Sequence, residues 1–339
     1  MYTNEVPLGG DMSWTFDFAR VPDEPWTNLP LEELAMKYDT VEEHGWYDNL
    51  IPTVNMLLEN HKPEELILDY SGGTGILVDR LFRAEKPSPN VLIVDSSPKF
   101  LRLALEKNKN NEKVGFRLIR YLREKRRLQF LEEVLGNSFY ARKADGLVST
   151  NAIHLYYQLP QTLRSWKEAL RSGAKVHIQS GNIRNPDADP DVWIIDETVE
   201  AIHKTAMELV RNQEEYTALR PLLDNVAYME AHDALRKKYF LPVRPRSFYT
   251  DTLTQAGFEE VNTSYSYIDA RVDQWYDFLV VYHEGVLGWV GGAQKITKKE
   301  ASSEEIALRK ALMWKAMQTL FSGGETFQTV WTYLNFRNH

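Results

Sequence analysis

The sequence predicts an α/β fold built on a mostly parallel sheet, with a helical cap inserted into it. Short apolar runs alternate five times with helix-forming segments between residues 61 and 181, which is typical of a parallel sheet covered by helices on both faces. A Gly-rich turn directly follows the first apolar run. The chain closes with a β-rich run, 327–336, which belongs inside a sheet because it is apolar on both faces.

The elements of the alternating part follow from apolar runs and the turns between them. Each predicted strand is a short apolar run, and each predicted helix lies between two such runs. The predicted strands are 66–69, 90–95, 114–119, 146–150 and 175–180. The predicted helices are 75–84, 98–107, 128–135 and 159–171.

The alternation stops after Gly181, where the chain enters a polar turn that contains two prolines, 185–191. The apolar positions that follow are spaced by 4, 3, 4 and 3 residues, which makes one apolar stripe on a helix. These positions are Ile195, Val199, Ile202, Ala206 and Leu209. We therefore expect residues 182–245 to form a helical cap.

The α/β pattern resumes after the cap with a helix at 247–256 and a strand at 260–268. Ser302 or Ser303 is expected to cap a helix that runs to about residue 321. The predicted organisation has four parts: an N-terminal arm with lid helices, a core, the cap, and the completion of the core sheet. Their ranges are 1–60, 61–181, 182–245 and 246–339.

Composition and charge disfavour several classes of protein. The chain has 339 residues, of which 43% are apolar, and a net charge of −8. Because a nucleic-acid binder usually carries a basic field, we expect no nucleic-acid partner. The dense basic stretch at 117–127 is interpreted as a solvated helix face, with an anion-binding role as the alternative. The lack of cysteine excludes disulfides, Cys-ligated zinc and thiol catalysis.

The sequence also predicts a cytoplasmic protein without a membrane partner. It begins with no basic region followed by an apolar run, so we expect no signal peptide. No stretch approaches the ~18 consecutive apolar residues of a membrane-spanning helix. The 17 Tyr and 9 Trp residues serve either core packing or a pocket for an apolar or planar substrate. The oligomeric state stays open.

The Gly-rich turn carries most of the functional information. It reads Asp69-Tyr-Ser-Gly-Gly-Thr-Gly75, and the second predicted strand ends in Asp95. Glycines allow positive φ angles and a close approach of the backbone to a ligand, and the helix that follows offers free N–H groups. A carboxylate at the end of the second strand can accept both ribose hydroxyls of a nucleoside. We therefore expect a nucleoside to lie across the ends of these two strands.

This ordered set of motifs resembles class I S-adenosylmethionine (SAM)-dependent methyltransferases, which have a Rossmann-like sheet. The resemblance covers residues 35–181 and 245–268. It rests on the Gly-rich turn, on 94–101 for the second strand, on 145–154 for the fourth, on 171–178 for the turn into the fifth, and on 256–258 before the sixth. It implies that 327–336 is an antiparallel seventh strand beside strand five.

The resemblance implies a role for several residues. Asp69 and the backbone of Ser71, Gly72, Gly73 and Gly75 would surround the methionine part of SAM. Asp95 would hold the ribose, Ser96 would lie against the adenine, and Asn151 would lie near the sulfonium. The sequence departs from the family pattern at Ser71, where Gly is usual, and at Ser96, where a larger apolar residue is usual.

Two other glycine patterns bear on this interpretation. A nicotinamide-dependent oxidoreductase would use Gly-x-Gly-x-x-Gly at this turn, which the spacing of Gly72, Gly73 and Gly75 fits poorly. The run from Gly288 to Gly292 follows no obvious strand and is interpreted as a structural turn.

The candidates for acceptor chemistry lie near the fourth strand and before the first. His154 is the candidate general base, with a structural histidine as the alternative. Tyr38 is expected to contact SAM from a lid helix, and Trp46, Tyr156 and Tyr157 to line the acceptor site, with simple packing as the alternative. The eight histidines show no spacing typical of metal ligands, so we expect no metal.

The sequence thus predicts a SAM-dependent methyltransferase that acts on the O, N or C atom of a small organic acceptor. Three alternatives remain: a SAM-binding protein that does not methylate, an NAD(P)-dependent oxidoreductase, and a protein-binding module on a degenerate fold of this type. The identity of the acceptor does not follow from the sequence.

Overall fold

The computed structural model describes residues 14–189 and 191–339 and is built around one seven-stranded sheet. The strand order is β10-β11-β7-β6-β1-β2-β3. The central strands are β1 (Leu66–Tyr70), β2 (Asn90–Asp95), β3 (Val114–Leu118), β6 (Ala144–Thr150) and β7 (Leu170–Ser180). Two long strands, β10 (Phe258–Arg271) and β11 (Thr326–Asn338), complete the sheet.

The pairing of the strands confirms the predicted sheet. β1, β2, β3, β6 and β7 all run parallel to one another. β11 lies between β7 and β10 and is antiparallel to both. The closing strand is therefore inserted beside the fifth strand in sequence, as the resemblance implied, and the fold is the Rossmann-like sheet of that family.

Alternating side chains of the central strands pack against two layers of helices, as expected for strands that are buried on both faces. Ile67, Val91 and Ile93 belong to one core cluster, with α2 (Ile51–Asn60), α3 (Ile76–Arg83) and α4 (Pro98–Asn108). Leu66, Leu68, Leu92 and Val94 belong to the other, with α5 (Asn137–Arg142), α6 (Leu159–Ala169) and α10 (Arg246–Gln255).

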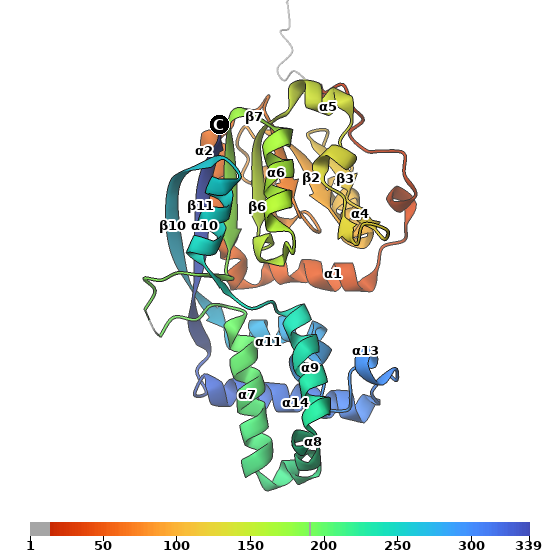
Figure 1. Ribbon diagram of the computed structural model, residues 1–339, viewed down its shortest axis with the longest axis vertical. Coiled ribbons are helices and arrows are strands. Elements are labelled where there is room, and N and C mark those ends of the chain that lie inside the picture. The colour runs from red at the N-terminus through yellow and green to blue at the C-terminus, as the bar shows by residue number, and fades with distance from the viewer. Residues whose placement is uncertain (1–13, 190) are drawn as a thin grey trace, which may run out of the picture.

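A helical lobe lies beyond the carboxyl ends of the central strands, and the long strands β10 and β11 lead toward it (Figure 1). The segment expected to form the cap contributes α7 (Glu197–Asn212), α8 (Arg220–Asp224) and α9 (Val226–Tyr239). A second stretch of chain contributes α11 (Val272–Val281), α12 (His283–Leu287), α13 (Gln294–Thr297) and α14 (Ser303–Leu320). Buried residues of α7, α11, α12 and α14 share one core cluster, so the lobe is built from both stretches.

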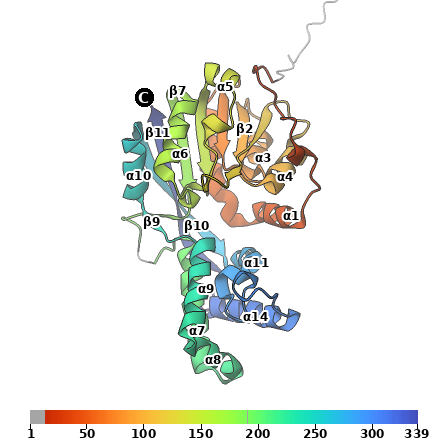
Figure 2. The same ribbon diagram turned by 45° about the vertical axis from the view of Figure 1, so that its right-hand side comes forward.

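The N-terminal part of the described chain passes along the edge strand β3 and then across the carboxyl ends of the strands. The irregular segment that begins at residue 14 contacts the edge strand β3, where Phe116 N donates to Arg20 O at 3.0 Å. The short helix α1 (Glu33–Asp39) then crosses below the carboxyl ends of the strands, between sheet and lobe (Figures 1 and 2). The part of the expected arm at 1–13 lies outside the described residues.

Two local predictions have opposite outcomes. The expected helix at 128–135 is wrong: the chain there ends the hairpin of β4 (Tyr121–Leu122) and β5 (Arg127–Leu128) and makes one 3₁₀ turn, Leu131–Glu133. The hairpin and Gly136 explain the difference, because Leu128 is paired with Tyr121 and Gly136 is extended with a ψ of 174°, which leaves too few residues between them for a regular helix. The expected cap of the last helix is confirmed, since Ser302 and Glu305 form a capping box at the start of α14.

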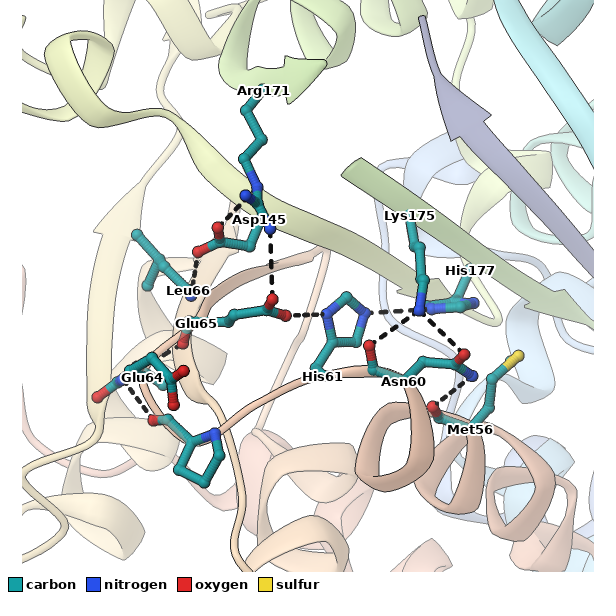
Figure 3. Close-up of polar contacts among 12 residues, drawn as sticks. Met56, Asn60, His61, Glu64, Glu65, Leu66, Asp145, Arg171, Lys175 and His177 are labelled. Carbon is teal, nitrogen blue, oxygen red and sulfur yellow. Dashed lines mark hydrogen bonds and ion pairs between the residues drawn. The ribbon is translucent and has the colours of Figure 1, made fainter. Parts of the chain in front are cut away.

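A polar cluster closes the amino ends of the central strands (Figure 3). His61 Nδ1 lies 2.8 Å from Glu65 Oε2, and His61 Nε2 lies 3.3 Å from His177 Nε2. Arg171 reaches Asp145 Oδ1 at 2.8 Å and Glu65 Oε1 at 3.3 Å. We call these five residues the amino-edge cluster. It joins the loop before β1 to β6 and β7.

A buried glycine makes room for this cluster. A Cβ on Gly146 of β6 would lie 2.6 Å from His61 Cε1 and 3.0 Å from Ile67 Cδ1. The first separation is shorter than real Cβ contacts, and the second is tight. Gly146 therefore lets the His61 ring lie against the sheet.

Among the described residues, no helix is both long and apolar enough to cross a membrane.

Candidate functional site

A pocket of about 330 Å³ opens at the carboxyl ends of β1, β2 and β6, where the Gly-rich turn leaves the sheet. We call it the turn pocket. Most of the residues that the sequence assigned to cofactor binding line it. They are Tyr38, Ser71, Gly72, Gly73, Asp95, Ser96 and Asn151.

The backbone of the turn is left-handed at three positions. Ser71 has a φ of 66°, Gly73 a φ of 57° and Gly75 a φ of 82°. Positive φ costs glycine little but strains serine, so Ser71 needs outside support. Its Oγ accepts a hydrogen bond from Tyr156 Oη at 3.0 Å, and Tyr156 Oη also lies 2.9 Å from Ser149 Oγ. Tyr156 therefore links the hydroxyl of Ser71 to Ser149 of β6.

Asp95 connects the turn to the second strand. Its two oxygens accept hydrogen bonds from Gly73 N at 2.9 Å and from Ser97 N at 2.7 Å. Burial raises the pKa of Asp95, and the backbone hydrogen bonds offset only part of this effect. A carboxylate offers about four lone-pair sites, so two remain for the hydroxyls of a ligand in the pocket.

Asp69 lies beneath the turn instead of in the wall of the pocket. It has no solvent exposure, and neither carboxylate oxygen has a hydrogen-bond partner among the described residues. A Cβ on Gly72 would lie 2.7 Å from Asp69 Cγ, so only glycine lets the turn pass over this carboxyl. Burial, and to a lesser extent the charge of Asp95, raises the pKa of Asp69 to about 7.

A second cavity of about 270 Å³ adjoins the turn pocket on the side of the helical lobe. We call it the aromatic chamber. Tyr38, Tyr47, Phe100, Asn151 and Leu155 line both cavities and therefore mark their junction. The other aromatic side chains of its wall come from distant segments. They are Trp46, Tyr239, Phe240, Trp275, Phe278, Tyr282 and Trp331.

Asn151 is held rigidly at this junction. Its Oδ1 accepts hydrogen bonds from Trp331 Nε1 at 2.8 Å and from Gln179 Nε2 at 3.2 Å. Its φ of 52° places it in the left-handed region, which asparagine tolerates better than most residues. The side chain expected near the sulfonium is thus fixed between the turn pocket and the aromatic chamber.

His154 lines the aromatic chamber and belongs to a polar group in its wall. His154 Nε2 lies 3.1 Å from Asn182 Nδ2, and His154 Nδ1 lies 3.3 Å from Ser180 Oγ. Asn182 Nδ2 also donates to Asp196 Oδ2 at 2.7 Å, while Asp196 N donates to Asn182 Oδ1. The last contact fixes the orientation of the amide, so Asn182 donates to both neighbours.

The protonation states of this group follow from its burial. Burial lowers the pKa of His154 to about 4 and raises the pKa of Asp196 to about 7. His154 is therefore neutral near pH 7, and both its ring nitrogens already have partners. Asp196 is the group in this wall whose pKa suits proton exchange at neutral pH.

The remaining predicted residues lie in different places. Trp46 is buried in the wall of the aromatic chamber. Tyr156 lies behind the Gly-rich turn and lines the turn pocket, not the chamber. Tyr157 is 77% exposed and lines neither of the two cavities. Gly75 ends the turn as the N-cap of α3 and does not line the turn pocket.

Sequence reasoning missed most of the chamber. Asn182 and Asp196 are separated by the polar turn, and Trp275 and Phe278 lie in a helix that was not predicted. Trp331 lies in the predicted closing strand, but only its hydrogen bond to Asn151 reveals its role. The one available signal was the unusual supply of Trp and Tyr.

Among the described residues, no group of three or more His, Asp or Glu side chains is placed to hold a metal ion.

Comparison with known proteins gives only distant likenesses. No family model matches the chain, and no curated protein matches it. Among solved structures it is similar to a methyltransferase-like protein from Bacillus halodurans C-125, at 14% identity over 84% of this chain and 98% of that one, with a TM-score of 0.48.

Two further structures carry a ligand in their description. The phosphoethanolamine N-methyltransferase 2 of Haemonchus contortus, in complex with SAM, is 13% identical over 90% of this chain and 56% of that one, with a TM-score of 0.46. A SAM-dependent methyltransferase from Geobacter sulfurreducens, in complex with S-adenosylhomocysteine, is 11% identical over 86% and 91%, with a TM-score of 0.44. All three TM-scores are below 0.5, so the description of the site depends on the contacts within this chain.

Proposed function

We propose that this protein binds SAM in the turn pocket and transfers its methyl group to a small organic acceptor in the aromatic chamber. The observation that carries the proposal is the junction of the two cavities at Asn151, directly beside a Gly-rich turn tied to Asp95. A nucleoside cofactor and an acceptor could thus meet there. SAM, when bound, supplies a methyl carbon that its sulfonium activates.

The residues of the turn pocket fit this cofactor. The Cβ position of Gly73 meets no atom within 4 Å, so the turn leaves open space for a ligand. Asp95 keeps free lone pairs for ribose hydroxyls, and the exposed Ser96 leaves room for a planar base. Among the described residues that line the pocket, Asp95 is the one with a formal charge. This charge favours a cofactor with a cationic part over an anionic pyrophosphate.

The aromatic chamber fits a small acceptor. It is bounded by α1, by the 3₁₀ helix Gly45–Leu50, and by α9, α11 and β11. Methyl transfer needs the acceptor aligned and water excluded more than it needs strong acid–base chemistry. Asn151 at the junction and the aromatic wall supply alignment and exclusion. Asp196 is placed to accept a proton where the acceptor must lose one.

Calorimetric titration with S-adenosylhomocysteine tests the proposal. The wild type is compared with Asp95→Ala and with a control, Asp251→Ala, which removes an exposed carboxylate on α10. Loss of a charge-assisted hydrogen bond costs about 1.5–3 kcal/mol, so Asp95→Ala should weaken binding about ten- to hundredfold. The control should bind like the wild type.

The alternatives give different results. A folded wild type that fails to bind S-adenosylhomocysteine overturns the proposal, and binding of NADH in its place would indicate an oxidoreductase. A protein that binds SAM but forms no S-adenosylhomocysteine with any acceptor would be a non-methylating SAM protein. Formation of S-adenosylhomocysteine together with a methylated acceptor supports the proposal.

A further inference from the structure

We propose that the aromatic chamber takes a cationic amine, whose ammonium group lies against the aromatic rings and pairs with Asp196. This inference rests on the proposed function for the identity of the neighbouring cofactor, and it names the acceptor class. It follows from the composition of the chamber wall and from the single charge in it.

The wall is unusually aromatic. Ten of the seventeen residues that line the chamber are Phe, Tyr or Trp. They pack on one another as a unit: the Trp46 ring lies 5.9 Å from Trp275, 5.8 Å from Phe278 and 6.1 Å from Trp331 between centroids. The packing holds the rings in place before a ligand arrives. Fixed aromatic faces attract cations, and cages of this kind recognise methylated ammonium groups.

The charge of the wall has one sign. Asp196 is the one lining residue among those the structure describes that is Asp, Glu, Lys or Arg. Its Oδ2 accepts a hydrogen bond from Asn182, a neutral amide, and within 14–189 and 191–339 no Lys, Arg or His forms an ion pair with the carboxylate. A carboxylate in an apolar wall is stabilised by a cation that arrives with a ligand.

The neighbouring groups support this reading. His154 adds no positive charge, because its Nε2 accepts from Asn182 and burial keeps it neutral near pH 7. Burial raises the pKa of Asp196 to about 7, as expected for a carboxyl that lacks a cationic partner. An ammonium ligand would supply that partner.

The same wall disfavours anionic acceptors. A phosphate or carboxylate group in the chamber would face Asp196 and the negative faces of the rings, without Lys or Arg among the described lining residues. The chamber thus distinguishes amines from acids by charge and from neutral molecules by the cation–π attraction of its wall.

Binding of choline and of its neutral isostere 3,3-dimethylbutan-1-ol tests the inference without turnover. Choline carries the charge, but its nitrogen cannot accept a methyl group. Both probes are titrated into the wild type by calorimetry, with and without saturating S-adenosylhomocysteine. We expect choline to bind at least about tenfold more tightly than the neutral isostere.

Two pairs of variants locate the site. Asp196→Asn keeps the shape and removes the charge, so it should weaken choline about ten- to hundredfold and leave the isostere unchanged. Its control is Asp191→Asn, an exposed aspartate outside the chamber. Phe278→Leu removes one ring of the wall and should weaken choline several-fold, whereas Phe248→Leu on α10, outside the chamber, should not.

The outcomes separate this inference from the proposed function. Charge-selective binding that depends on Asp196 and Phe278 supports the inference. Equal or tighter binding of the isostere, or failure of choline to bind a wild type that binds S-adenosylhomocysteine, overturns the inference alone. Failure of the folded wild type to bind S-adenosylhomocysteine overturns the proposed function instead. If Asp196→Asn does not fold, the affinities of the wild type for choline and for 3,3-dimethylbutan-1-ol still test the inference.

Discussion

At the amino ends of the central strands, the carboxylates of Asp145 and Glu65 each pair with Arg171. At the carboxyl ends, the carboxylates of Asp69, Asp95 and Asp196 form no ion pair with any residue that the structure describes. Asp95 is held by backbone amides, Asp196 by an amide side chain, and Asp69 by no described partner. Figure 3 shows the side chains of the amino-edge cluster, with Arg171 pointing toward both Asp145 and Glu65. One end of the sheet is thus completed by the protein itself, and the proposed function assigns the other end to a ligand.

The energetic consequences differ in the same way. A buried polar network that is fully paired supports the fold, while an unpaired buried charge costs stability. Functional sites often carry such costs. We therefore expect changes at the amino edge to affect folding and changes at the carboxyl edge to affect ligand binding, and the following predictions sharpen or break that contrast.

Acid should weaken the fold through His177. Burial lowers its pKa from 6.5 to about 4, so the unfolded chain binds a proton first as the pH falls. The stability that His177 contributes is present above pH 6.5 and is lost on the way to pH 4, by about 3 kcal/mol in total. Urea unfolding at pH 7 and pH 4 should show this loss in the wild type and a smaller one in His177→Gln.

The control for this prediction is His339→Gln, which changes an exposed histidine paired with Glu259. It should follow the wild type. Equal acid sensitivity of His177→Gln and the wild type would contradict the assignment of the effect to the amino-edge cluster.

The space for His61 can be tested by filling it. Gly146→Ala places a Cβ against the His61 ring and should lower the free energy of unfolding by about 2–3 kcal/mol, as overpacking of a buried site does. Gly136→Ala is a matched control, because a Cβ there meets no atom within 4 Å. Urea unfolding measures both. Similar free energies of unfolding for the two variants would contradict the prediction, because the His61 ring would then move aside at little cost.

A rise in pH should lower the free energy of unfolding through Asp69, at the carboxyl ends of the strands. Its pKa rises from 3.8 in the unfolded chain to about 7 in the folded one. The stability that it contributes is complete below pH 3.8 and is lost as the pH rises to 7. Between pH 5.5 and pH 8 the wild type should lose about 2 kcal/mol more than Asp69→Asn. Parallel pH dependence of the two proteins in urea unfolding would show that Asp69 finds a partner in solution.

The smallest effect is expected at Tyr157. This side chain is 77% exposed and lines neither the turn pocket nor the aromatic chamber. Tyr157→Ala should leave the dissociation constant for S-adenosylhomocysteine within about twofold of the wild type. A larger change in calorimetry would restore Tyr157 as a binding residue.

The sheet could be predicted because local pattern determines it. Runs such as 90–95 are short, apolar and bounded by turns, and β2 occupies that range. The segment that forms α11 could not be assigned, because Val272–Val281 is rich in apolar residues without a clear period. Short apolar runs of this kind do not distinguish a helix from a strand.

The candidate site also has one part that the sequence predicts, the turn pocket, and one part that it does not, the aromatic chamber. The Gly-rich turn and Asp95 are close in sequence to the strands that position them, so their places were predictable. The chamber depends on contacts over long separations, such as Trp331 Nε1 with Asn151 Oδ1. Asp196 follows a polar turn and shows no local motif. Only the packing of the lobe on the sheet brings it beside His154.

The contrast between the two ends of the sheet is tested most directly by Asp95→Asn and Asp145→Asn, each measured for S-adenosylhomocysteine affinity and for the free energy of unfolding. Asp95→Asn should weaken binding about ten- to hundredfold and change stability by about 1 kcal/mol or less. Asp145→Asn should leave affinity within about twofold and lower stability by about 2 kcal/mol, since its ion pairs are partly exposed. Normal binding by Asp95→Asn would contradict the account.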